Sequence, residues 1–230
     1  MGHLQVCLKN CIVNWNFSTN ISSEGWVTAL CTFVPWSWRH RNSVSLPIIK
    51  NFFQILRTEN PDLKIGAAGF CWGGRYAILA AQKTFNDPPL VDAVFAGHPS
   101  MLSIPADVSH PIRPISIAVA SIDNWYPPKT AKKTEELWKP FEDIKTQFVI
   151  YEDAKHGFCV RGNMNNPKEK ENMEKAIDQV SFALDKIKIF RLLTGSTSIL
   201  HNEILTVTPL EVITVWNQRS ANDCLREIYC

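Results

Sequence analysis

The sequence has no long uninterrupted apolar run and no excess of charge of either sign. Its longest apolar windows, such as residues 28–38, are interrupted by proline and tryptophan. They are shorter than the roughly twenty apolar residues that a membrane-spanning helix needs. The 24 lysines and arginines against 22 aspartates and glutamates give a net charge of +2, without a long block of one sign. These absences argue against a membrane segment, an anionic membrane surface and nucleic acid as partners.

Paired cysteines and glycine-rich cofactor motifs are also missing. The seven cysteines are scattered and show no C-x-x-C spacing, which zinc sites and redox pairs use. Gly66 and Gly69 do not complete a G-x-G-x-x-G fingerprint, which disfavours a dinucleotide site. His98 and His110 lack a spaced cysteine or carboxylate partner, so we expect structural roles for them rather than metal binding. With no basic start followed by an apolar core, we expect a reduced, soluble, cytoplasmic protein without metal or cofactor.

What the sequence does contain is enough apolar material for one large domain, since 45% of its 230 residues are hydrophobic. Between residues 47 and 187, strand-like and helix-like segments alternate with turn residues between them. This pattern is typical of an α/β layer structure around a mostly parallel sheet with flanking helices. Strands are predicted at residues 64–70, 90–96, 115–120 and 147–151, helices between Pro47 and Asn60, at 74–83, at 130–138 and from about Pro167 to 187, and a loop at 152–162.

The two ends of the sequence differ from this middle part. Residues 1–45 show no clear period of 2 or 3.6, the repeats that mark strands and helices. Residues 188–230 contain β-branched runs but no site that can be interpreted. We therefore divide the chain into an atypical N-terminal segment (1–46), an α/β domain (47–187) and an atypical C-terminal extension (188–230).

The stretch at residues 64–77 carries the most chemical information. Its apolar run ends in GFCWGG at residues 69–74, and the pattern then becomes helical. This is the G-x-C-x-G pattern of a nucleophile elbow, a tight strand-to-helix turn that needs glycine-sized neighbours on both sides of its apex. The N-terminus of the following helix favours a thiolate at Cys71 and offers backbone N–H groups, that of Trp72 among them, to an oxyanion. The alternative is that Cys71 simply packs at the turn as a small hydrophobe.

A thiol nucleophile needs a base and a group that fixes the base, and after such an elbow the acid precedes the histidine. Asp123 follows the predicted strand at 115–120, and His156 lies in the loop after the next strand. His156 would take the thiol proton, and Asp123 would fix its tautomer. Either residue alone would be interpreted as a turn aspartate or a solvated histidine. The ordered trio at three strand ends favours a catalytic triad, with Asp153 as a competing acid.

Two further residues are candidates of lesser weight. Arg161, which follows His156 by five positions, could hold a substrate carboxylate with its guanidinium fork or could simply be solvated. Cys159 is close to His156 in sequence, but we disfavour it as a redox partner for Cys71.

With the stretches GFCWGGRYA, AGHPS, SID and KHGFCVRG assembled, the chain resembles the dienelactone hydrolase family, especially its fungal members, over about residues 47–187. The resemblance implies an α/β-hydrolase fold with a Cys-His-Asp triad, carried here by Cys71, His156 and Asp123. It also implies hydrolysis of lactone or small ester bonds through an acyl-thioester, and Arg161 matches an arginine that helps hold the substrate's carboxylate. A small lactone or ester is then the expected partner, whereas the oligomeric state is not predicted.

The sequence departs from the family's pattern before the elbow. Family members have several strands there, with a loop that donates the second oxyanion N–H and a glutamate that readies the thiol. Residues 1–45 are too few for that part, so we expect the sheet to lack part of its N-terminal half and to expose an apolar edge. Two hypotheses follow: a cysteine-dependent hydrolase, or a catalytically impaired or non-catalytic remnant that acts, if at all, as a binding module.

Overall fold

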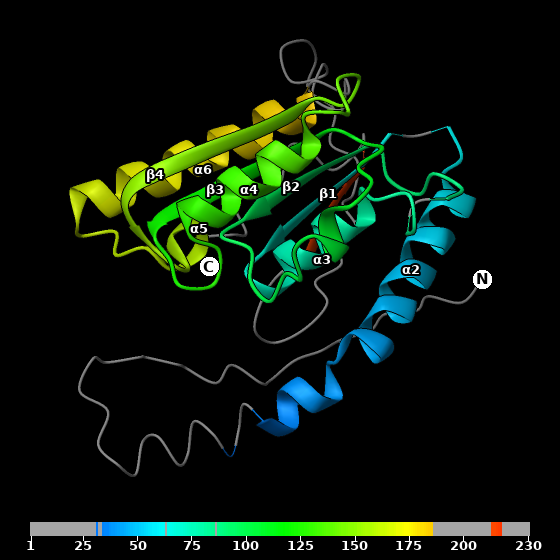
Figure 1. Cartoon of the computed structure of the whole chain (residues 1–230), viewed down its shortest axis with the longest axis horizontal. Coiled ribbons are helices and arrows are strands. Elements are labelled where there is room, and N and C mark those ends of the chain that lie inside the picture. The colour runs from blue at the N-terminus through cyan, green and yellow to red at the C-terminus, as the bar shows by residue number, and fades with distance from the viewer. Residues whose placement is uncertain (1–30, 32–33, 63, 86, 186–212, 218–230) are drawn as a thin grey trace, which may run out of the picture.

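The computed structural model describes residues 31, 34–62, 64–85, 87–185 and 213–217. Within these ranges, no helix combines the length and the apolar content that crossing a membrane requires. The elements are α2 (Asn42–Glu59), β1 (Ile65–Phe70), α3 (Trp72–Ala80), β2 (Ala93–Gly97), the 3-10 turn η1 (Ala106–Val108), β3 (Ile115–Ile122), α4 (Pro128–Trp138), β4 (Thr146–Lys155), α5 (Phe158–Arg161), α6 (Pro167–Asp185) and β5 (Ile213–Asn217) (Figure 1).

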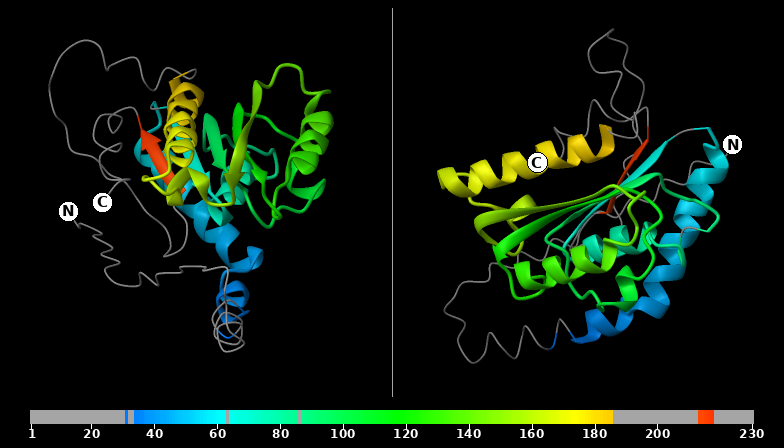
Figure 2. Two further views of the ribbon diagram at one scale, coloured as in Figure 1. Left: turned by 90° about the vertical axis from the view of Figure 1, so that its left-hand side faces the viewer. Right: turned by 45° about the horizontal axis from the view of Figure 1, so that its top comes forward.

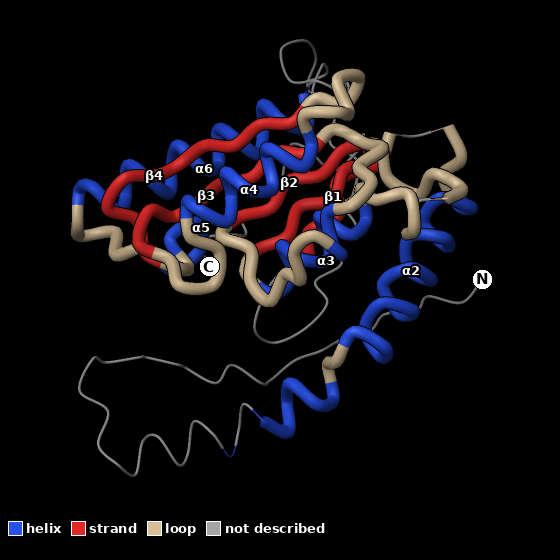
Figure 3. Tube along the Cα trace, in the orientation of Figure 1, coloured by secondary structure: helices blue, strands red, loops and turns tan. Residues whose placement is uncertain are grey.

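The strands form one sheet in the order β4-β3-β2-β1-β5 (Figure 3). β1 to β4 are parallel, and β5 is antiparallel to β1. Because parallel strands point the same way, their carboxyl ends meet at one end of the sheet. Cys71, Asp123 and His156 directly follow the ends of β1, β3 and β4. The predicted α/β class with a mostly parallel sheet is confirmed.

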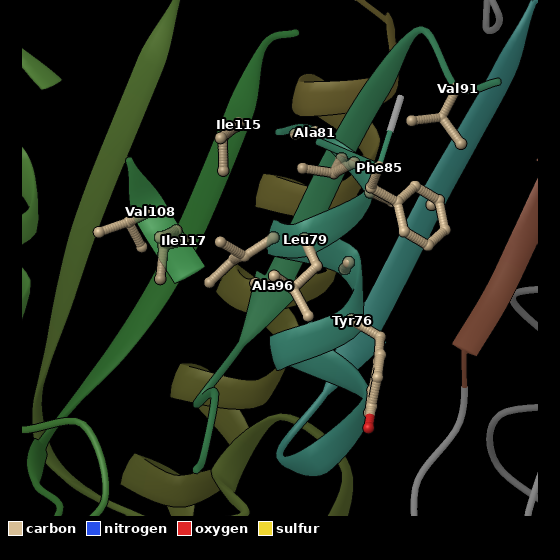
Figure 4. Close-up of a cluster of buried hydrophobic side chains, with 14 of the residues drawn as sticks. Tyr76, Leu79, Ala81, Phe85, Val91, Ala96, Val108, Ile115 and Ile117 are labelled. Carbon is tan, nitrogen blue, oxygen red and sulfur yellow. The ribbon is translucent and has the colours of Figure 1, made fainter. Parts of the chain in front are cut away.

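Helices cover both faces of the sheet, with α4 and α6 on opposite sides (Figure 2). Successive strand residues face opposite ways, so Ala67 joins the core under α2, α3 and α4, whereas Ala68 joins the core under α5 and α6. Figure 4 shows part of the first core, where Leu79 of α3 lies close to Ala96 and Ile117 of the sheet. The near-continuous apolar strands predicted from the sequence are explained by this burial on both faces.

The edge of β1 is covered by β5. Gly69 lies opposite Ile213, and Ile65 lies opposite Asn217. In the described part of the chain no strand precedes β1. The prediction that the edge of β1 is open is wrong, because β5 pairs with it. Backbone groups at a sheet edge pair with any suitable extended segment. Here that segment comes from residues 188–230, whose β-branched content favours a strand.

The first described helices begin earlier than the sequence pattern suggests. Residues 34–39 are helical, and α2 starts at Asn42 and continues through Pro47. Pro47 has no N–H to donate to the carbonyl of the preceding turn. The helix is stabilised instead by its apolar face, from which Ile49 and Phe53 are buried in the core shared with α3.

β4 is longer than predicted and runs to Lys155, so the start of the predicted loop at 152–162 is strand and its later part contains α5. The sequence looks like a loop there because its charged residues face solvent, while Ala154 is buried. The pairing of β3 with β4 shifts register in this region, and Asp153 has a positive φ of 60°. These are the features of a β-bulge, which bends the strand end.

A buried polar network joins α6 to the sheet. The hydroxyl of Tyr151 donates to Oε1 of Gln179 (2.8 Å), and Nε2 of Gln179 donates to Oγ of Ser116 (2.9 Å). Ser116 in turn donates to Oε1 of Gln147 (2.9 Å). Because buried polar groups are costly when unpaired, this network favours one placement of α6 on the sheet.

Candidate active site

Steric crowding at the turn after β1 explains its glycines. A Cβ on Gly69 would lie 2.2 Å from the carbonyl oxygen of Gly73, a distance that no side chain tolerates. Cys71 occupies the apex with φ 49° and ψ −113° and directly precedes α3. A non-glycine residue at positive φ is strained and persists where its surroundings hold it. Here the Cys71 N–H donates to the Gly97 carbonyl at 2.9 Å, and the Cys71 carbonyl accepts from the N–H groups of Gly74 (3.1 Å) and Ser100 (2.9 Å).

The structure brings together the three residues predicted as a triad. Nε2 of His156 lies 2.8 Å from Sγ of Cys71, and Nδ1 of His156 lies 2.8 Å from Oδ2 of Asp123. The Asp123 side chain is fully buried, and that of His156 is 19% exposed. The imidazole therefore has one nitrogen on an acid inside the protein and the other on the sulfur of the half-buried Cys71.

The carboxylate of Asp123 is held by its own turn. Its Oδ1 accepts from the backbone N–H of Trp125 at 2.8 Å and from that of Tyr126 at 3.4 Å. This arrangement is an Asx turn, and it leaves Oδ2 for His156. Because an ionised carboxylate only accepts hydrogen bonds, Nδ1 of His156 must carry a proton. Nε2 then either faces the thiol with its lone pair or donates to the thiolate.

Trp72 is the first residue of α3 and directly follows the nucleophile. Its backbone N–H lies at the positive end of the helix dipole, where a developing oxyanion is stabilised. Its indole ring packs against Tyr76, Trp36 and His40, with ring centroids 4.5, 5.8 and 6.1 Å away. Residues 34–40 therefore support the elbow, which their lack of a clear sequence pattern did not reveal.

Arg161 is exposed at the end of α5. Its guanidinium lies over Gly157, the residue after His156, where an added Cβ would meet Nε at 2.9 Å. With the described residues, its side chain makes no hydrogen bond or ion pair. The structure thus places this cation beside the histidine loop, and its charge contributes to lowering the pKa of His98.

Sequence reasoning missed the part that His98 and Ser100 play in this region. His98 is fully buried, and its ring centroid lies 5.0 Å from that of His156 at an interplanar angle of 85°. Neither of its ring nitrogens has a hydrogen-bond partner in the described structure. Burial, together with the charges of His156 and Arg161, lowers its pKa well below 6.5.

Oγ of Ser100 lies 3.4 Å from Sγ of Cys71. His98 and Ser100 both follow β2, so the strand-end rule used for Asp123 and His156 could have identified them.

The alternative candidates lie elsewhere. Asp153, the competing acid, is exposed, and the imidazole of His156 bonds to Asp123 instead. Cys159 is buried as a free thiol, and burial raises its pKa well above 9.0. His110 is exposed with its ring 5.4 Å from that of Phe141. Among the described residues, no cluster of three or more His, Cys, Asp or Glu side chains is arranged to hold a metal ion.

The dienelactone hydrolase family model matches residues 37–187, and the chain belongs to this family. It is 26% identical over 144 residues to the hydrolase pyvD of Aspergillus violaceofuscus, covering 63% of this chain and 56% of that protein. It is 29% identical over 133 residues to the hydrolase tropI of Talaromyces stipitatus, covering 58% of this chain and 50% of that protein. The chain thus spans about half the length of the curated relatives it matches.

Solved structures show a partial likeness. A thermophilic esterase of Thermogutta terrifontis is similar with a TM-score of 0.43 at 18% identity, over 56% of this chain and 57% of that chain. A protein of Thermoplasma acidophilum described as a CIB-like hydrolase gives a TM-score of 0.43 at 18% identity, over 63% of this chain and 60% of that chain.

Proposed function

We propose that this chain is a cysteine-dependent hydrolase of small lactones or esters. The observation that carries the proposal is the 2.8 Å separation between Sγ of Cys71 and Nε2 of His156, with the buried carboxylate of Asp123 on the far side of the imidazole. A nucleophile, a base and a group that orients the base are the parts that covalent acyl transfer requires. Membership of the dienelactone hydrolase family supports the hydrolase class.

In the first half of the proposed reaction, Nε2 of His156 accepts the thiol proton and Sγ of Cys71 attacks the carbonyl carbon. The carbonyl π electrons move to oxygen, which becomes an oxyanion at the N-terminus of α3 near the Trp72 N–H. When the C–O bond to the leaving alcohol breaks, His156 returns the proton to that oxygen. The product is an acyl-thioester on Cys71, and for a lactone the alcohol stays tethered to the acyl group.

In the second half, a water molecule attacks the thioester carbonyl while Nε2 of His156 takes its proton. Collapse of the tetrahedral intermediate expels the sulfur of Cys71, which regains a proton from His156. The acid is then released. We place Arg161 next to a substrate carboxylate, because its exposed guanidinium has no side-chain partner among the described residues and suits a bidentate contact.

The test is the release of acid from a dienelactone and of nitrophenol from p-nitrophenyl acetate by the purified full chain. Cys71→Ala should lower kcat by about a thousandfold or more, the scale seen when a triad nucleophile is removed. Cys159→Ala is the matched control, because it removes a buried thiol of the same kind and should leave kcat unchanged. Circular dichroism of both variants checks that they are folded. Equal turnover by Cys71→Ala and the native protein would refute the assignment.

The competing proposal is a remnant that has lost turnover. Its supporting observation is that no described strand precedes β1. The resemblance to the family implies a second oxyanion donor in the part of the sequence before β1. Removal of one such donor costs about 10²- to 10³-fold in kcat. A native chain whose Cys71 reacts with a thiol reagent but releases no nitrophenol would support this second proposal over the first.

A further inference from the structure

Ser100 contacts the nucleophile through both its side chain and its backbone. Its Oγ lies 3.4 Å from Sγ of Cys71, and its N–H donates to the Cys71 carbonyl at 2.9 Å. The residue is 4% exposed, so water does not readily compete for its hydroxyl. Among the described residues, the sulfur is the hydroxyl's one hydrogen-bond partner.

The fold holds the Ser100 loop in place from both sides. His98 and Met101, which flank the segment, have positive φ angles of 35° and 56°. Further along, Arg75 of α3 forms an ion pair with Asp107 at 2.9 Å, and the same carboxylate accepts from the N–H of Ser103 at 2.8 Å. These contacts connect α3, the helix that directly follows Cys71, to the loop that carries Ser100.

The chemistry of the two groups determines the direction of the contact. In the neutral form, the thiol of Cys71 donates to Oγ of Ser100 at 3.4 Å. A thiolate only accepts hydrogen bonds, whereas a serine hydroxyl carries one proton to donate, so the direction reverses when Cys71 ionises. When Cys71 ionises, its sulfur can accept from the imidazolium of His156 and from Ser100 at the same time. A hydrogen bond to a charged group is stronger than one to a neutral group, so the Ser100 contact favours the ionised form.

We infer that Ser100 is a second hydrogen-bond donor to the ionised sulfur of Cys71 and adds to the stabilisation that His156 provides. The inference rests on the proposed function, in which Cys71 is the nucleophile. It also predicts an opposing effect on reactivity, because the hydrogen bond from Ser100 stabilises the same negative charge on sulfur that attacks the carbonyl carbon. A more stabilised thiolate is a weaker nucleophile. The logarithm of its rate constant falls by about 0.4–0.5 for each unit by which the pKa of the thiol falls.

The experiment measures the rate at which iodoacetamide alkylates Cys71 as a function of pH, followed by mass spectrometry of the Cys71 peptide. Ser100→Ala should move the midpoint of this profile up by about one pH unit, which, together with its faster plateau, gives about threefold slower alkylation below the midpoint. At high pH, its plateau should be about threefold faster than that of the native chain. Ser103→Ala removes an exposed hydroxyl from the same loop and should leave the profile unchanged.

Two further variants separate a direct contact from a structural effect. In a His156→Ala background, Ser100→Ala should still raise the midpoint, because the hydroxyl contacts the sulfur directly. Ser100→Gly removes the same hydroxyl with a different side-chain volume and should shift the midpoint in the same direction, which keeps a test available if the alanine variant does not fold. An unchanged midpoint in Ser100→Ala or Ser100→Gly, or a shift that disappears without His156, would overturn the inference.

The same experiment distinguishes this inference from the proposed function. Alkylation reports the state of the sulfur whether or not an ester is hydrolysed. If Ser100→Ala shifts the profile while the native chain releases no nitrophenol, Ser100 acts as inferred and the hydrolase proposal fails. If esters are turned over but the profile does not move, the hydrolase proposal stands and Ser100 has no such role.

Discussion

The carboxylate of Asp123 lies 2.8 Å from Nδ1 of His156, although 33 residues separate them in the sequence. The contact depends on Trp125, whose backbone N–H occupies the other carboxylate oxygen at 2.8 Å. A turn of three residues thus fixes the acid, and the acid fixes the imidazole. The orientation of the base is set by local backbone geometry at the end of β3.

Replacing this carboxylate should impair the base more than it affects the fold. In Asp123→Asn, the amide can present an N–H to Nδ1 and so favour the tautomer whose proton faces the sulfur. We expect kcat for ester hydrolysis to fall by about 10²- to 10⁴-fold. Asp153→Asn is the control, because this exposed residue of the bulge should tolerate the change. A larger effect at Asp153 than at Asp123 would mean that the acid has been assigned wrongly.

The sequence allowed the triad candidates to be named because the elbow motif fixes one position and chain order fixes the other two. It could not show that the loop after β2 returns to the nucleophile, since that contact is made by backbone groups of Cys71, Gly97 and Ser100. The C-terminal part of β4 was not predicted, because the charged residues on its exposed side give this segment the composition of a loop. β5 was also unpredictable, because its β-branched run does not specify a partner and β1 is distant in the sequence.

The close approach of Gly69 to Gly73 predicts a large effect on stability. In Gly69→Ala, the new Cβ would lie 2.2 Å from a backbone oxygen, so the strand or the helix must move. We expect the free energy of unfolding to fall by about 3 kcal/mol or more. Gly162→Ala, whose Cβ would meet its nearest neighbour at 3.3 Å with an ordinary φ of −67°, should cost less than about 1 kcal/mol. Urea unfolding of both variants measures the difference, and equal losses would contradict the steric argument.

The environments of Cys71 and Cys159 predict selective labelling. Cys71 lies beside His156 at the start of a helix, conditions that promote thiolate reactivity. Cys159 is buried, and burial raises its pKa well above 9.0. Under native conditions at neutral pH, iodoacetamide should label Cys71 at least about tenfold faster than Cys159. Peptide mapping by mass spectrometry gives both rates. Comparable rates would show that the described burial of Cys159 does not hold in solution.

The buried imidazole of His98 predicts a dependence of stability on pH. Its pKa is lowered well below 6.5 by burial, so the unfolded chain binds a proton at a pH where the folded chain does not. Stability is therefore lost as the pH falls below about 6.5, at up to ~1.4 kcal/mol per pH unit for this one group. His98→Asn, which tolerates a positive φ, should flatten the slope between pH 6.5 and 5. Urea titrations at several pH values test this, and identical slopes would rule out His98 as the cause.

The guanidinium of Arg161 has no hydrogen-bond or ion-pair partner within the described part of the chain, and this predicts discrimination between substrates. For an ester that carries a carboxylate, Arg161→Gln should raise KM roughly tenfold or more, because this is the affinity that the loss of a charge-assisted hydrogen bond removes. For the neutral p-nitrophenyl acetate, KM should not change. Arg161→Lys keeps the charge without the bidentate fork and should restore part of the affinity. If both substrates are affected equally, Arg161 supports the loop rather than the ligand.

β1 leaves the ribosome long before the strand that covers its edge. Roughly 145 residues separate it from β5, which corresponds to about seven to thirty seconds at elongation rates of ~5–20 residues per second. From the completion of β4 at Lys155 until β5 is made, the nascent chain carries the four parallel strands while β1 still lacks β5 on one side. We expect molecular chaperones to be needed most in this window, and the newly synthesised protein to aggregate most readily when translation stalls before residue 213.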